Sequence, residues 1–84
     1  MNNKINLLRK EIDKIDQQLV ELIAKRFKTT SKIISLKTTA GLPKTNIKRE
    51  KQIFDNIVNL AKKKNINSQF ICNLFKTIIK EGKK

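Results

Sequence analysis

The feature that most constrains this chain is a run of apolar residues spaced alternately three and four positions apart near its N-terminus. The run comprises Ile5, Leu8, Ile12, Ile15, Leu19 and Leu22, and Arg26 occupies its next position. This repeat is typical of one face of a long helix that packs against another helix. Segment 38–43, which contains Gly41 and Pro43, ends the pattern. We therefore expect a helix over about residues 4–38, roughly 50 Å long, with another helix lying alongside it.

Two shorter helices are predicted in the second half of the chain. Apolar residues at helical spacing indicate one helix over about 46–63 and another over about 67–81. The candidate N-cap residues are Asn46 or Thr45 for the first and Asn67 or Ser68 for the second. No segment shows the sustained alternation of a strand. The expected fold is all-α, with one long and two short helices in a single domain over residues 1–84.

The short length of the chain predicts a partner subunit. A monomer of 84 residues buries only about 60 to 65% of the surface of its unfolded chain. The sequence offers no other source of stability, because Cys72 is the single cysteine, histidine is absent and no residue cluster indicates a metal site. We expect no metal and no cofactor, and we expect Cys72 to be a buried hydrophobic residue.

Charge and hydropathy limit the possible partners. Twenty basic and seven acidic residues give a formal charge of +13, which predicts attraction to anions such as nucleic acid, a membrane surface or a small polycarboxylate. The N-terminus lacks the apolar segment of a signal peptide, and no apolar run approaches the ~20 residues that span a membrane. We expect a cytoplasmic protein that does not bind membranes.

Three of the basic residues are arginines, Arg9, Arg26 and Arg49, whose guanidinium groups offer a bidentate fork to carboxylates. Arg26 interrupts the apolar helix face, where a charge is costly unless it is paired. It either fixes helix register, pairs with an acid of another subunit, or binds an anionic ligand, and the scarcity of acids near this face favours the ligand. Lys37 lies 11 residues further along and returns to nearly the same face. These two residues can line one pocket.

The other basic candidates leave more than one interpretation open. Arg9 lies 17 residues before Arg26, roughly 25 Å along one helix, so the two cannot grip one small molecule within a single chain. Arg9 is either solvent-exposed or, if two long helices pack antiparallel across a two-fold axis, reaches the site of the partner. Arg49 and Glu50 belong to the first turn of the second helix. They are either an exposed base and an acid favoured by the helix dipole, or part of the pocket.

The arrangement of these basic residues on one long and two short helices is similar to that of the all-helical, type II chorismate mutases. The resemblance covers about residues 5–81. It is carried by 8–13, 15–16, Leu19, 22–26, Lys37, Pro43, 47–50, 70–71 and 74–81. It implies an intertwined helical homodimer that converts chorismate to prephenate in aromatic amino acid biosynthesis.

The resemblance also implies how the substrate is held. Arg26, with Arg9 from the partner subunit, would clamp the two substrate carboxylates, and Lys37 would hydrogen-bond the ether oxygen. Negative charge grows on that oxygen as its bond breaks, so the contact with Lys37 strengthens in the transition state. The reaction is an intramolecular rearrangement, which positioning and electrostatics can accelerate without a nucleophile or metal.

The remaining implied contacts include three departures from the family. Glu50 would accept the ring hydroxyl, Asn46 would lie near the same hydroxyl, and Arg49 would add to the positive charge. Relatives often carry Asp in place of Asn46, a change that a backbone contact would survive. They typically carry Ser in place of Gly82, whose backbone N–H would reach a carboxylate, and Gln four residues later, where this sequence has already ended. Either a terminal lysine substitutes, the sequence is trimmed, or the enzyme is weak, since losing such a donor costs ~10²–10³ in rate.

Two other functions compete with this interpretation. An isochorismate pyruvate-lyase resembles the mutases in fold and basic residues, and acts on a positional isomer of the substrate. A basic helical protein that binds nucleic acid is the second, but the sequence carries no zinc finger, basic zipper or platform of aromatic residues. We expect nucleic acid to bind only non-specifically, at low salt.

Overall fold

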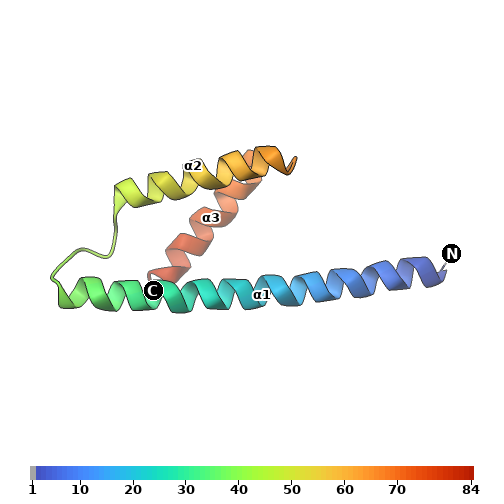
Figure 1. Ribbon diagram of the computed structural model, residues 1–84, viewed down its shortest axis with the longest axis horizontal. Helices are drawn as coiled ribbons and strands as arrows, with labels where there is room; N and C mark the ends of the chain where they lie inside the picture. The colour runs from blue at the N-terminus through green and yellow to red at the C-terminus, as the bar shows by residue number, and fades with distance from the viewer. Residues whose placement is uncertain (1) are drawn as a thin grey trace.

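The computed structural model describes residues 2–84, which form three helices and no strand (Figure 1). Helix α1 spans Asn2–Thr39, α2 spans Ile47–Lys63 and α3 spans Ser68–Gly82. The all-helical prediction, with one long and two short helices, is therefore confirmed. Helices were expected over 4–38, 46–63 and 67–81. Met1, which the expected domain over 1–84 includes, lies outside the described residues.

Side-chain caps define where the two short helices begin. Asn46 Oδ1 accepts a hydrogen bond of 3.1 Å from the backbone N–H of Arg49, and Asn67 Oδ1 accepts one of 2.9 Å from the backbone N–H of Phe70. Each bond satisfies a backbone donor that lacks a partner in the first turn of a helix. Of the candidate caps, the structure thus selects Asn46 and Asn67. Between α1 and α2 the chain reverses through Gly41, whose φ of 72° favours glycine.

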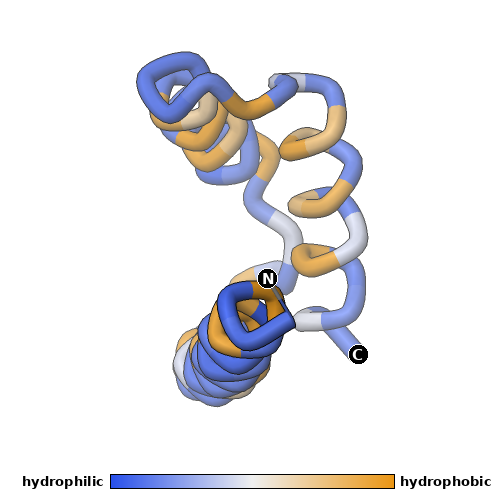
Figure 2. The backbone as a smooth tube through the Cα atoms, turned by 90° about the vertical axis from the view of Figure 1, so that its right-hand side faces the viewer, coloured by the Kyte–Doolittle hydropathy of each residue, from blue (hydrophilic) through white to orange (hydrophobic). Residues whose placement is uncertain are grey.

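The three helices form an open arrangement. Helix α3 packs against α2 and also contacts α1, whereas α1 and α2 do not pack directly within residues 2–84. Viewed along α1, both short helices lie to one side of it (Figure 2). The contact of α3 with α1 is close: a Cβ atom on Gly82 would lie 3.5 Å from Thr30 Cγ2 and 3.6 Å from Phe27 Cδ1. The N-terminal half of α1 projects beyond the other two helices.

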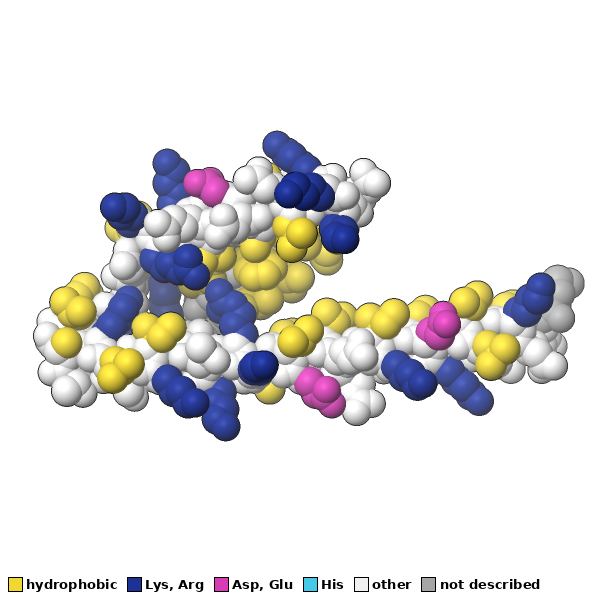
Figure 3. All heavy atoms as spheres, in the orientation of Figure 1, with side chains coloured by type: hydrophobic (Ala, Val, Ile, Leu, Met, Phe, Trp, Pro, Cys, Tyr) yellow, Lys and Arg dark blue, Asp and Glu magenta, His cyan; other side chains and the backbone are white. Residues whose placement is uncertain are grey.

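The chain buries very little of its apolar surface. Among residues 2–84 the buried hydrophobic residues are Ala61 and Ile78 alone, and Cys72, expected to be buried, is only half-buried. The apolar face of α1 is open, with Leu19 52% and Leu22 61% exposed. Hydrophobic side chains follow the projecting half of α1 in Figure 3. Within residues 2–84 no helix combines the length and the hydropathy that crossing a membrane requires.

The radius of gyration and the accessible surface also indicate an open structure. The radius of gyration is 16.7 Å, against about 12 Å for a compact domain of this length. The accessible surface is 7433 Å², whereas a compact monomer of this mass exposes about 5,200 Å². A single chain therefore exposes more surface than a compact protein of its size.

The cap of α3 can be tested by mutation. Replacing Asn67 with alanine should lower the free energy of unfolding by about 1 kcal/mol, because the backbone N–H of Phe70 loses its partner. Urea unfolding at fixed protein concentration measures the change. Asn59→Ala is a suitable control, since Asn59 is exposed in the middle of α2 and alanine favours a helix. Equal losses in the two variants would contradict the assigned cap.

Candidate functional site

A cavity of about 250 Å³ lies between the C-terminal half of α1 and the beginning of α2, and the end of α3 closes one side of it. Its walls come from all three helices and from the loop between α1 and α2. The lining residues are Arg26, Thr29, Thr30, Ile33, Ile34, Lys37, Lys44, Asn46, Arg49, Glu50, Ile53, Ile79 and Lys83. Basic side chains gather between α1 and α2 on this face of the molecule (Figure 3).

The cavity brings together five of the residues that the sequence singled out. Arg26 and Lys37 come from α1, Asn46 caps α2, and Arg49 with Glu50 occupies the first turn of α2. The capping bond of Asn46 fixes this turn, to which both Arg49 and Glu50 belong. The Arg49 guanidinium also donates a hydrogen bond of 3.5 Å to Gln52 Oε1 of the same helix. Their roles in binding a ligand remain predictions.

The charges around the cavity are strongly unbalanced. Five of its lining side chains are cationic and one, Glu50, is anionic. The cations are Arg26, Lys37, Lys44, Arg49 and Lys83. Like charges this close repel one another, and four isoleucines in the walls reduce the water that would screen them. A compact ligand with more than one negative charge would relieve this repulsion, and Glu50 leaves one place for a hydrogen-bond donor of that ligand.

Two of the cations are oriented by contacts of their own. The Arg26 guanidinium carbon lies 5.9 Å from the centre of the Phe75 ring, which belongs to α3, and a guanidinium over an aromatic face is attracted to it. Lys37 Nζ donates a hydrogen bond of 3.4 Å to the backbone carbonyl of Lys44. These contacts hold Arg26 at the inner side of the cavity and link Lys37 to the loop before α2.

Lys83 and Lys44 line the cavity, but neither was singled out as a site residue from the sequence. Lys83 Nζ pairs with Glu50 Oε2 at 2.5 Å, and both side chains are largely shielded from water. Lys84, by contrast, pairs with Glu81 at 2.7 Å on the surface. A terminal lysine as a substitute donor was among the expectations, but only the packing of α3 on α1 decides which lysine faces the cavity. No sequence pattern marks Lys44, whose place follows from the path of the loop.

Arg9 and Gly82 lie outside this cavity. Arg9 is exposed near the N-terminus of α1, so its own chain does not bring it to the other predicted residues. Gly82 contacts Phe27 and Thr30 instead of lining the cavity, although its neighbour Lys83 does line it. The predicted ligand contacts of Arg9 and Gly82 are therefore not formed by this cavity in one chain.

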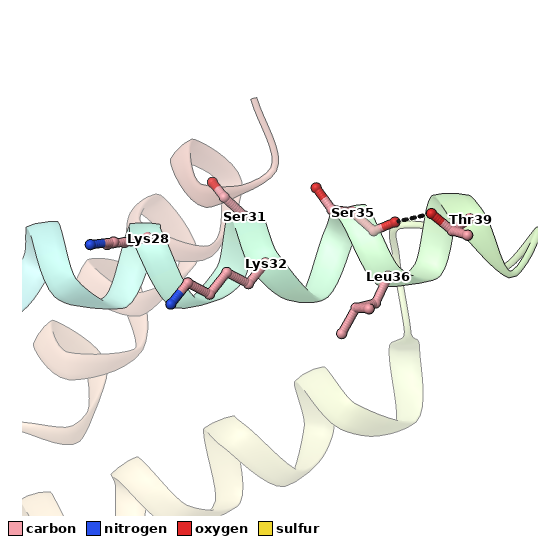
Figure 4. Close-up of a pocket in the computed structure, with 6 residues that line it drawn as sticks. All are labelled: Lys28, Ser31, Lys32, Ser35, Leu36 and Thr39. Carbon is pink, nitrogen blue, oxygen red and sulfur yellow. Dashed lines mark hydrogen bonds between the residues drawn. The ribbon is translucent and has the colours of Figure 1, made fainter.

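A second depression, on the surface of α1, has a different character (Figure 4). All six of its lining residues come from α1: Lys28, Ser31, Lys32, Ser35, Leu36 and Thr39. The hydrogen bond between them, 3.0 Å from Thr39 Oγ1 to the Ser35 carbonyl, stays within the helix. Because no second element contributes a side chain, we do not treat this depression as a binding site.

Fold and site together define the class: a small all-helical protein whose cavity is lined by cations from three helices. Such a lining suits a small polyanion. Residues 8–84 match the family model described as chorismate mutase type II, and the chain belongs to this family.

Named relatives are found among bacterial and archaeal proteins. The chain is 41% identical over 84 residues to the bifunctional chorismate mutase/prephenate dehydratase of Buchnera aphidicola from Schizaphis graminum, a match that covers 98% of this chain and 22% of that protein. It is 32% identical over 83 residues to the chorismate mutase of Methanocaldococcus jannaschii, covering 99% of this chain and 84% of that protein. The bifunctional relative of Escherichia coli K12 is 27% identical over 80 residues.

The chain spans about a fifth of the length of the bifunctional relatives. It spans most of the archaeal relative. No solved structure matches the chain significantly.

The cap at the cavity generates a prediction about Asn46. Asn46→Ala should lower the free energy of unfolding by about 1 kcal/mol, whereas Asn46→Asp should preserve it, because a carboxylate accepts the same hydrogen bond and is favoured at a helix N-terminus. Urea unfolding of the two variants beside the wild type measures the difference. A loss in Asn46→Asp as large as that in Asn46→Ala would contradict a capping role.

Proposed function

We propose that this chain is a chorismate mutase, which rearranges chorismate to prephenate in aromatic amino acid biosynthesis. The observation that carries the proposal is the convergence of Arg26, Lys37, Arg49 and Glu50 on one cavity in a chain of the type II family. Chorismate is a compact dianion with a ring hydroxyl and an ether oxygen. Its charge complements the surplus of cations, and its hydroxyl complements the single carboxylate.

The proposed mechanism rests on positioning and electrostatics. Arg26 binds one substrate carboxylate, while Arg49 adds positive charge beside it. Lys37 donates to the ether oxygen, on which negative charge develops as the carbon–oxygen bond breaks, so this contact stabilises the transition state more than the substrate. Glu50 accepts a hydrogen bond from the ring hydroxyl and fixes the orientation of the ring. The substrate is thereby held in the compact conformer from which the rearrangement proceeds.

A homodimer completes this proposal. The open face of α1 is the kind of surface that a second helix covers, and the chain exposes about 2,200 Å² more than a compact monomer, an area in the range of obligate interfaces. If two α1 helices pack antiparallel around a two-fold axis, Arg9 of one subunit approaches the cavity of the other and binds the second substrate carboxylate. Each dimer then contains two equivalent sites in one intertwined domain structure.

The remaining expectations stay predictions. These are a cytoplasmic location, the absence of membrane binding, and non-specific attraction of nucleic acid at low salt. Gly82 would act through its backbone N–H, for which the neighbouring substrate carboxylate is the proposed acceptor.

The first functional test follows the ultraviolet absorbance of chorismate with purified protein. We expect conversion to prephenate, and Arg26→Ala and Lys37→Ala should each lower kcat/KM by about 10²–10³-fold. Lys28→Ala, an exposed cation of α1 outside the cavity, is the matched control and should change kcat/KM less than about twofold. Failure to consume chorismate, or salicylate and pyruvate formed from isochorismate in its place, would refute the mutase assignment.

The second functional test asks whether two subunits share each site. Arg9→Ala and Arg26→Ala are each expected to be nearly inactive, and their co-folded equimolar mixture should recover about a quarter of wild-type activity. Half of the randomly paired dimers are then heterodimers in which one of two sites is intact. A mixture no more active than its components, or a solution mass of one chain, would exclude the shared site.

A further inference from the structure

We propose that Lys83 is a positioning residue of the active site, which holds the Glu50 carboxylate in the orientation that accepts the substrate hydroxyl. This inference rests on the proposed function and adds to it a residue that the family resemblance does not supply. The juxtaposition that carries it joins two residues 33 positions apart, one at the start of α2 and one at the end of α3.

The Lys83–Glu50 pair differs from the other ion pair among residues 2–84. The Lys84–Glu81 pair joins neighbouring turns of the same chain segment, and its side chains are 67% and 47% exposed. The Lys83 and Glu50 side chains are 29% and 28% exposed, and they connect two different helices across the cavity wall. Water screens the Lys83–Glu50 pair less than the Lys84–Glu81 pair, so the geometry of the Lys83–Glu50 pair is better defined.

The pair determines what Glu50 can do. Lys83 occupies Glu50 Oε2, which leaves Oε1 to accept a donor from a molecule in the cavity. The other four cations line the same cavity, and each carries a charge that attracts a carboxylate. Without Lys83, Glu50 would turn toward one of them and neutralise a charge that the substrate carboxylates need. Lys83 thus keeps the Glu50 carboxylate from pairing with the cations that would bind the substrate carboxylates.

The position of Lys83 is set by packing as well as by charge. Gly82 lies against Phe27 and Thr30 of α1, and this close approach brings the next residue to the place where all three helices meet the cavity. A positive charge at a helix C-terminus is favourable for its own sake. Lys84 shares that advantage without lining the cavity. A substitution of Lys84 therefore measures the effect of charge at the helix end without the effect of the contact with Glu50.

The test compares kcat/KM for chorismate in Lys83→Met, Lys83→Arg and Lys84→Met, with unfolding midpoints and solution mass measured for each. Lys83→Met should lower kcat/KM by about 10- to 100-fold, the scale of a misplaced contact. Lys83→Arg should restore part of the loss because it keeps the pair. Lys84→Met should match the wild type. Wild-type activity in a folded Lys83→Met, or an equal loss in Lys84→Met, would overturn the inference.

A double-mutant cycle separates positioning through Glu50 from direct action on the substrate. In the Glu50→Gln background, Lys83→Met should change kcat/KM less than about twofold, because its target carboxylate is already gone. An undiminished loss in that background would overturn the positioning role.

One readout does not depend on turnover. Lys83→Met should shift the carbon-13 resonance of the Glu50 carboxyl, whereas Lys84→Met should leave it in place, and an unmoved resonance would refute the pairing. If Lys83→Met shifts this resonance as expected but the wild-type protein leaves chorismate intact, the proposed function is refuted and the pairing stands.

Discussion

The exposed apolar face of α1 is the constraint on which the rest of the structure depends, because within residues 2–84 α1 packs against α3 alone. The two short helices contribute little core of their own, with Ala61 and Ile78 as the buried hydrophobic residues of the described chain. The same helix carries Arg26 and Lys37 into the cavity. Whatever covers the open face of α1 therefore also fixes the backbone that aims these two cations.

The cavity shows how a small helical protein can assemble charge without a large interior. Its five cations come from α1, from the loop before α2, from the first turn of α2 and from the end of α3. Contacts with neighbouring groups offset part of the repulsion, as for Arg26 over the Phe75 ring and Lys37 on the Lys44 carbonyl. A bound anion would offset the remaining repulsion among these cations.

The sequence predicted the features that follow from local periodicity and capping. The repeat from Ile5 to Leu22 and the caps at Asn46 and Asn67 define the helices, and helical geometry alone places Arg26 and Lys37 on one face. The convergence of Arg49 and Glu50 on them needed the family resemblance, because it depends on how the loop returns α2 toward α1. Lys83 could not be located in advance, since its place depends on the long-range contact of α3 with α1.

The packing around Gly82 leaves room for a side chain. Glycine weakens a helix end by leaving the backbone freer than alanine or serine would, yet the neighbouring atoms of Thr30 and Phe27 lie at ordinary contact distances from a Cβ placed there. No steric barrier therefore excludes a Cβ atom at position 82. The glycine is not a demand of this packing, and a small side chain there would fit the same junction of α1 and α3.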